Sequence, residues 1–143
     1  MTAAQRQEEL ISDYLAIDDP RERFQLIVET AASGLPNLSP EERSDKNLVP
    51  GCVSKVWLST RRSDSGTILV RVESESPALA GIATLFSRIY SGATDREILE
   101  TEPEFLQRLG IDRHLTPTRL RGLGNLRRLL VERIGAISRE EGP

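Results

Sequence analysis

The residue best suited to covalent chemistry in this sequence is its single cysteine, Cys52. Pro50 and Gly51 directly before it predict a turn, and the alternating residues after it predict a strand. The thiol is therefore expected at a loop tip or at the mouth of a strand, where a sulfur of another protein can reach it. The alternative is a small buried hydrophobe, because free cysteines are among the most buried residues in proteins.

A single cysteine also limits what the chain can do with sulfur and metals. It excludes an internal disulfide and, with only one histidine (His114) present, a conventional zinc or iron–sulfur site built from this chain alone. We therefore expect no metal and no cofactor of its own. Whatever Cys52 does, it does as one sulfur atom.

Composition and charge narrow the class of protein further. The chain has 143 residues, is 38% hydrophobic and 29% charged, and carries a net charge of −3. This balance predicts a globular protein with no general affinity for nucleic acid or an anionic membrane. The apolar stretches are shorter than a bilayer span, and the N-terminus lacks a signal-peptide core. We expect one domain over residues 1–143, located in the cytoplasm.

Helices are expected in the first third and in the second half of the chain. Asp19, Ser76 and Thr116 each precede a proline, and a polar N-cap followed by proline favours a helix start. Thr94 and Glu97 form a capping-box pattern. The last helix has an apolar seam formed by Leu120, Leu123, Leu126, Leu130, Ile134 and Ile137.

Strands are expected between these helical regions. Residues 53–60 and 68–73 alternate between apolar and polar side chains, and Ser63-Asp64-Ser65-Gly66 supplies turn residues between them. Two strands alone are marginally stable, so helices must cover one face of the hairpin. The predicted fold class is α+β, with a small antiparallel sheet packed against helices.

The basic residues of the last helix suggest no separate function. Arg121, Arg127, Arg128 and Arg133 alternate with the apolar seam, and acidic neighbours dilute their charge. They are expected to form a solvated helix face rather than a nucleic-acid site.

Three separated stretches follow a common pattern. They are Asn47-x-x-x-Gly51-Cys52-x-Ser54-x-Val56-Trp57, Arg23-Phe24 with the later Gly34-Leu35-Pro36, and residues 114–119 with Gly122-Leu123. Together they resemble the SufE/CsdE family of sulfur acceptors, with blocks in matching order from about Leu10 to Ile137. Small departures occur at Val53, Lys55 and Thr118, of which Lys55 could alter the electric field at Cys52.

This resemblance implies a SufE/IscU-like fold, shared with the scaffold proteins of iron–sulfur cluster assembly. It also implies that a cysteine desulfurase of the SufS/CsdA type, which carries pyridoxal phosphate, holds sulfur as a persulfide on its own cysteine. By this resemblance, Cys52 would take that sulfur and deliver it toward a cluster scaffold complex, and removal of the product would stimulate the desulfurase. The chain would then be a sulfur-transfer accessory protein rather than a stand-alone enzyme.

The resemblance suggests supporting residues as well. Arg119 matches a family arginine in the first turn of the last helix, and its positive charge near Cys52 would favour a thiolate or perthiolate. The alternative is a structural arginine that holds loop carbonyls. His114 is a weaker candidate, for which a hydrogen bond at the helix entry is the simpler role. Glu73 and Glu75 are expected at a solvated strand end beside the Cys52 loop.

Three further residues are expected to be structural. Asn47 and Gly51 would shape the loop that carries Cys52, and Trp57 would pack on the sheet. If the free Cys52 is buried, we expect its loop to turn outward when a desulfurase docks, because a carried persulfide needs shelter.

Two other functions compete with the sulfur acceptor. One is a cluster-assembly scaffold of the related fold, which would need several ligands near Cys52. The other is a helical interaction module with a structural cysteine. The module predicts that Cys52→Ser leaves function intact, whereas the acceptor predicts that sulfur transfer is lost and the fold is retained.

Overall fold

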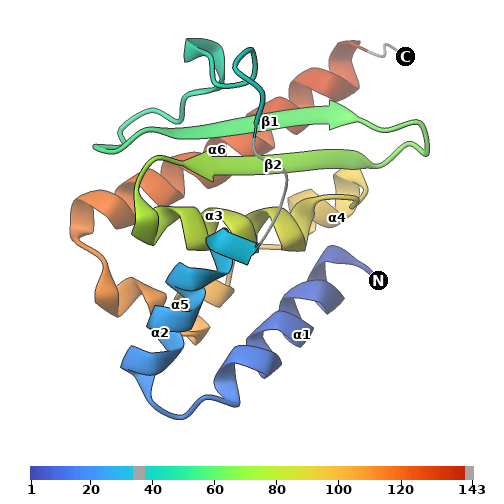
Figure 1. Ribbon diagram of the computed structural model, residues 1–143. Helices are drawn as coiled ribbons and strands as arrows, with labels where there is room; N and C mark the ends of the chain where they lie inside the picture. Colours follow the sequence, from blue (N-terminus) through green and yellow to red (C-terminus); the bar gives the residue numbers. More distant parts are fainter. Residues whose placement is uncertain (34–37, 141–143) are drawn as a thin grey trace.

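A computed structural model describes residues 1–33 and 38–140, and the structural statements that follow refer to these residues. Its elements, in chain order, are α1 (Ala3–Leu15), α2 (Pro20–Glu29), η1 (Thr30–Ser33), η2 (Asp45–Asn47), β1 (Val56–Arg62), β2 (Ile68–Ser74), α3 (Pro77–Tyr90), α4 (Asp95–Glu100), α5 (Phe105–Arg108), η3 (Ile111–His114) and α6 (Pro117–Glu140). Helices packed on a small antiparallel sheet confirm the predicted α+β class (Figure 1). The Gly34-Leu35-Pro36 segment lies outside the described residues.

The predicted helix starts are present with their side-chain caps. The carboxylate of Asp19 accepts a hydrogen bond from the backbone N–H of Arg21 at 2.9 Å, and Pro20 is the first residue of α2. Ser76 caps α3 in the same way. Thr94 and Glu97 complete the predicted capping box at the start of α4. These local contacts satisfy N–H groups that a helix leaves unpaired at its first turn.

The hairpin supplies one apolar face for the helices. β1 and β2 pair antiparallel from Val56 opposite Ser74 to Arg62 opposite Ile68. Helix α3 packs against β2 and α6 packs against β1, while α1 and α2 lie on α3 (Figure 1). The contact between α2 and α3 is close: a Cβ at Gly81 would lie 2.1 Å from the carbonyl oxygen of Ile27. The core lies between these layers and consists mainly of aliphatic side chains.

One part of the arginine prediction for α6 is wrong. Arg127 does not belong to a solvated face, since only 8% of it is exposed. Its guanidinium donates to the carbonyl oxygens of Ile98 at 2.9 Å and Leu99 at 3.2 Å and lies 5.5 Å from the ring centre of Tyr90. The carbonyls at the C-terminal end of a helix lack partners within the helix, and a cation there satisfies them. Arg127 therefore joins α6 to the end of α4.

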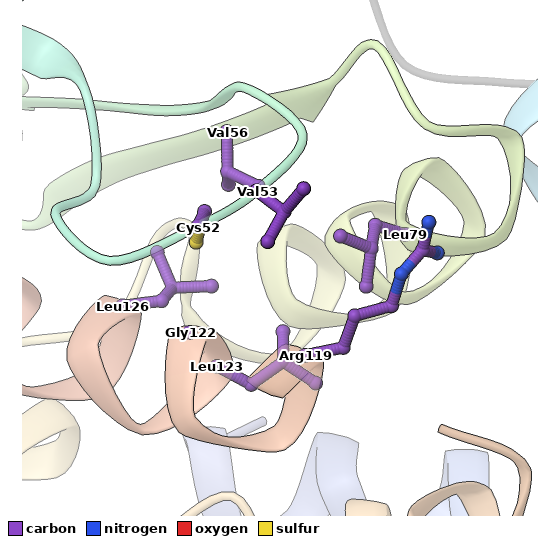
Figure 2. A pocket seen from close by; sticks show the side chains of 8 residues that line it. All are labelled: Cys52, Val53, Val56, Leu79, Arg119, Gly122, Leu123 and Leu126. Carbon is purple, nitrogen blue, oxygen red and sulfur yellow. The ribbon is translucent and has the colours of Figure 1, made fainter. Parts of the chain in front are cut away.

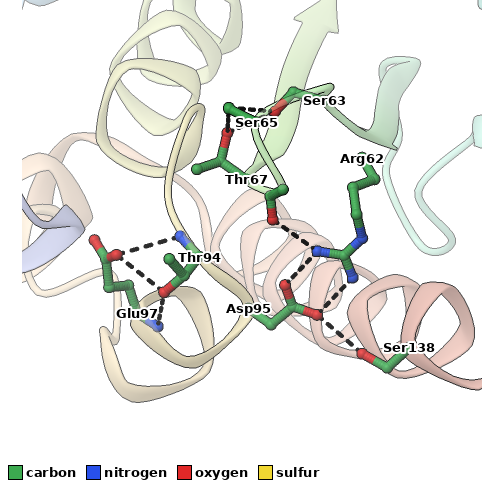
Figure 3. A network of polar contacts seen from close by, with 9 residues as sticks. Arg62, Ser63, Ser65, Thr67, Thr94, Asp95, Glu97 and Ser138 are labelled. Atoms are coloured by element: carbon green, nitrogen blue, oxygen red, sulfur yellow. Dashed lines mark hydrogen bonds and ion pairs between the residues drawn. The ribbon is translucent and has the colours of Figure 1, made fainter. Parts of the chain in front are cut away.

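A second polar contact holds the C-terminal end of α6. The guanidinium of Arg62, at the end of β1, pairs with both carboxylate oxygens of Asp95 at 2.8 and 2.9 Å. The hydroxyl of Ser138 donates to the same carboxylate at 2.9 Å (Figure 3). This network ties the hairpin, α4 and α6 together at the end of the sheet away from Cys52. No described helix combines the length and the apolar composition that a membrane crossing requires.

Candidate functional site

Cys52 lies in a short loop that two strand-like contacts close at its base. The backbone N–H of Val49 donates to the carbonyl oxygen of Val56 at 2.9 Å, and Leu48 bridges Trp57. Residues 50–55 between these contacts form the Cys52 loop, just before β1. The prediction that Cys52 follows a turn is therefore confirmed, but the strand after it begins at Val56 rather than at Val53.

The two ends of the Cys52 loop are held by different elements. At Lys55, the backbone N–H donates to the Glu75 carboxylate at 3.0 Å and the carbonyl accepts from the Glu75 N–H at 3.1 Å. Glu75 is thus a bonded partner of the loop. Glu73 instead pairs with Arg43 at 2.7 Å. Because Lys55 is held through its backbone, β2 anchors the end of the loop that enters β1.

The other end of the loop lies on α6. The side-chain amide of Asn125 donates to the carbonyl oxygen of Pro50 at 2.8 Å. Gly51 has a φ of +78°, a region that residues with a side chain rarely occupy. A Cβ at this position would also lie 2.5 Å from the Asn125 amide nitrogen. Gly51 shapes the loop, as predicted, by supplying this turn and allowing the backbone to approach α6.

The thiol itself faces a small apolar pocket between the loop, α3 and α6 (Figure 2). The lining residues are Cys52, Val53, Val56, Leu79, Arg119, Gly122, Leu123 and Leu126. Its free volume is about 10 Å³, close to what one water molecule needs. Small-molecule sites are usually some 30-fold larger, at about 300 Å³ or more. The pocket therefore has room for about one further atom beside the thiol and not for a bound metabolite.

Gly122 brings the helix backbone directly under the thiol. A Cβ built at this position would lie 2.7 Å from Sγ of Cys52, closer than a real contact allows. The resemblance included Gly122 only as part of a segment, and the structure adds this contact as the reason for glycine. Any side chain here would displace the sulfur or the helix.

Burial in this pocket changes the acidity of the thiol. Cys52 is half-buried, and its removal from water raises the pKa of the thiol above its ordinary value. An apolar environment disfavours the charged thiolate, so the resting thiol stays protonated at neutral pH. Burial against α6 therefore lowers the thiolate fraction of Cys52.

Arg119 reaches the same pocket from the first turn of α6, as the sequence suggested. One nitrogen of its guanidinium donates to the hydroxyl of Ser76, the N-cap of α3, at 3.1 Å. Arg119 is the charged residue among the pocket-lining side chains. The bond to Ser76 is structural, and support of a thiolate stays a prediction.

His114 is placed elsewhere. It lies in η3, and its ring stacks on Phe24 with centres 4.5 Å apart and an angle of 10° between the planes. It is not among the residues that line the Cys52 pocket. The structure therefore brings Cys52 and Arg119 together but does not bring His114 to them.

Asn47 supports the segment before the Cys52 loop. It is buried, its side-chain amide donates to the carbonyl oxygen of Glu42 at 2.8 Å, and its oxygen accepts from Arg133 at 3.0 Å. Arg133 also donates to the carbonyl oxygen of Lys46. Arg133, like Arg127, is therefore not simply a solvated arginine, because it fastens this segment to α6.

The sequence patterns did not indicate that Asn125 and Leu79 lie at the site. A signal for Asn125 did exist, since it lies three residues after Gly122 and so on the same face of a helix. Nothing in the sequence placed that face against the Cys52 loop, about 70 residues earlier in the chain. Leu79 looked like any core position of α3.

Comparison with known proteins now adds to this geometry. The family model described as SufE, an Fe-S metabolism associated domain, matches residues 8–134. This chain belongs to the SufE family. Membership supports a role in iron–sulfur metabolism, and Cys52 with its loop lies inside the matched region. Among solved structures, the chain is similar to a hypothetical protein from Thermus thermophilus, solved in solution. The two share 20% sequence identity, with a TM-score of 0.75 over 96% of this chain and 98% of that one. This likeness shows that the two chains share a fold.

Proposed function

We propose that this SufE-family protein accepts persulfide sulfur from a cysteine desulfurase on Cys52 and carries it toward iron–sulfur cluster assembly. The observation that supports this most is the position of Cys52. A lone thiol lies on a surface loop and faces an apolar pocket with room for about one atom. A carrier of one sulfur atom needs that combination of access and shelter.

The transfer step needs no cofactor on this chain. The Cys52 thiolate attacks the terminal sulfur of the desulfurase persulfide, and a new sulfur–sulfur bond forms at Cys52. The old sulfur–sulfur bond breaks, its electron pair stays with the desulfurase cysteine, and that thiolate takes up a proton as Cys52 has lost one. Removing the product in this way lets the desulfurase turn over faster.

The closed loop suits the carrying stage better than the transfer stage. A persulfide is easily reduced by small thiols, and an apolar pocket of this size excludes them. The same burial raises the pKa of Cys52, which lowers the thiolate fraction needed for attack. The Cys52 loop therefore turns outward when the desulfurase docks. Equal alkylation rates of Cys52 with and without the desulfurase would contradict this step.

Arg119 is proposed to stabilise the charged form of the loaded sulfur. A nearby guanidinium stabilises the negative charge of a perthiolate at the pocket, because an apolar site offers few other dipoles to do so. Its bond to Ser76 keeps the guanidinium at the pocket without neutralising it.

The scaffold alternative finds no support at the pocket. Apart from Cys52, the lining residues are apolar except for Arg119, and none of these is an ordinary metal ligand. Among the described residues, no three His, Cys, Asp or Glu side chains gather into a group that could hold a metal ion.

The test is the intact mass of the protein after incubation with cysteine and a desulfurase that carries pyridoxal phosphate. Wild type is expected to gain sulfur atoms that a reductant removes, and Cys52→Ser is expected to gain none while keeping its fold. Serine differs from cysteine by one atom, so this control leaves the loop and pocket intact. No mass gain on wild type with several desulfurases would overturn the proposal.

A further inference from the structure

Asn125 makes the hydrogen bond that joins the Cys52 loop to α6. Its amide nitrogen donates to the carbonyl oxygen of Pro50 at 2.8 Å. Within the described part of the chain, the loop's other hydrogen bonds are at Lys55, whose N–H donates to the Glu75 carboxylate and whose carbonyl accepts from the Ser74 hydroxyl and the Glu75 N–H. The end of the loop that carries Cys52 is therefore held to α6 by this one amide and by apolar packing.

The orientation of the amide is set by a second contact. The guanidinium of Arg128 donates to the side-chain oxygen of Asn125. A guanidinium can only donate, so the amide oxygen must face Arg128 and the amide nitrogen must face Pro50. Arg128 is exposed, which fits a role in orienting Asn125 rather than one in the core.

The backbone of the loop is shaped to lie on this amide. Gly51 approaches so closely that a Cβ would lie 2.5 Å from the amide nitrogen of Asn125. Gly122, one turn earlier on the same helix, makes the corresponding close approach to Sγ of Cys52. Positions 122 and 125, one turn apart on α6, thus contact two successive residues of the loop: Gly122 contacts Cys52, and Asn125 contacts Gly51.

We propose that Asn125 is a positioning residue that holds the Cys52 loop on α6 and so limits exposure of Cys52 until a partner docks. The inference rests on the proposed sulfur-acceptor function for the reason that Cys52 is sheltered, whereas the contacts of Asn125 do not depend on that function. The bond lies at the surface, where water replaces it readily, and a single hydrogen bond contributes little net free energy. It can therefore close the loop at rest and still yield to a docking partner.

The test uses alkylation of Cys52 by iodoacetamide in the free, full-length chain, over a range of pH and without a desulfurase. Asn125→Ala and the similarly sized Asn125→Leu both remove the donor. Losing one net hydrogen bond shifts the equilibrium between closed and open loop about 2- to 10-fold. We expect alkylation to accelerate by that factor and its pH midpoint to fall, because the thiol spends more time in water.

Gly124→Ala is the matched control. It lies on the same helix between the two contacting positions, and a Cβ there meets no atom within 4 Å. Its alkylation rate and pH midpoint should equal those of wild type. Unchanged rates and midpoints in both Asn125 variants, or equal acceleration in Gly124→Ala, would overturn the inference. Because no desulfurase is present, this result is independent of the mass test for sulfur loading.

Discussion

At the scale of single residues, the chemistry of Cys52 is governed by what α6 places under it. A reactive thiol needs an exposed thiolate, whereas the resting Cys52 is half-buried with a raised pKa. The sulfur fits there because residue 122 is glycine. We therefore expect the reactivity of Cys52 to depend on its contact with Gly122, although the two residues lie far apart in the sequence.

Gly122→Ala should move the thiol out of its pocket. The new Cβ would lie 2.7 Å from Sγ, so the sulfur or the loop must shift. We expect faster alkylation of Cys52 than in wild type and a lower pH midpoint, measured with iodoacetamide. Gly124→Ala adds the same methyl group to the same helix in open space.

The same pair of variants makes a prediction about stability. Replacing glycine by alanine within a helix stabilises it by about 1 kcal/mol, and Gly124→Ala should show this gain in urea unfolding. Overpacking typically costs about 1–3 kcal/mol, so Gly122→Ala should show no gain or a loss. Equal stability and equal alkylation rates in the two variants would show that a side chain at position 122 does not displace Sγ of Cys52.

At the scale of elements, α6 positions the site through polar contacts at both of its ends and along its length. Arg127 joins it to the C-terminal end of α4, and Arg133 joins it to the segment before the Cys52 loop. The sequence indicated a solvated arginine face because these residues alternate with leucines. Long arginine side chains can instead reach carbonyls at the edges of a buried seam.

Arg127→Met should destabilise the protein by about 2–3 kcal/mol in urea unfolding at pH 7. Methionine fills similar space but leaves the carbonyl oxygens of Ile98 and Leu99 without this donor, and burying such groups is costly. Arg121→Met, at an exposed position of the same helix, should change stability by less than about 0.5 kcal/mol. Equal effects of the two substitutions would show that the buried contacts contribute nothing.

At the scale of the whole molecule, the end of the sheet away from Cys52 depends on an ionised carboxylate. The hydrogen bonds from Arg62, together with that from Ser138, lower the pKa of Asp95 from 3.8 to about 2. A carboxyl group whose pKa falls on folding stabilises the folded state when it is ionised. This contribution is complete above the unfolded-state pKa and is lost as the pH falls from about 4 to about 2.

Asp95→Asn should therefore cost about 1 kcal/mol of unfolding free energy at pH 7 and progressively less toward pH 2. Urea unfolding at pH 7, 4 and 2.5 measures the difference from wild type. Glu100→Gln removes an exposed ion pair with Arg96 from the same helix and should have little effect at any pH. A difference for Asp95→Asn that is independent of pH would argue against the ionised pair.

Local signals in the sequence determined much of this protein. The N-caps at Asp19, Ser76 and Thr94 and the alternation in the hairpin predicted the elements, because they depend on residues only a few positions apart. The turn at Pro50-Gly51 predicted a loop position for Cys52 for the same reason. The three family-like segments pointed to the SufE family, which the family match confirms.

Only the tertiary structure decided what surrounds Cys52. Gly122, Asn125 and Leu79 reach its loop because α3 packs against β2 and α6 packs against β1. Periodicity shows which face of a helix is apolar, but not which loop crosses that face. The stacking of His114 on Phe24 and the inward turn of Arg127 are likewise long-range contacts. One short segment of the sequence was therefore enough to single out the candidate thiol, whereas its pocket is assembled from residues far apart in the chain.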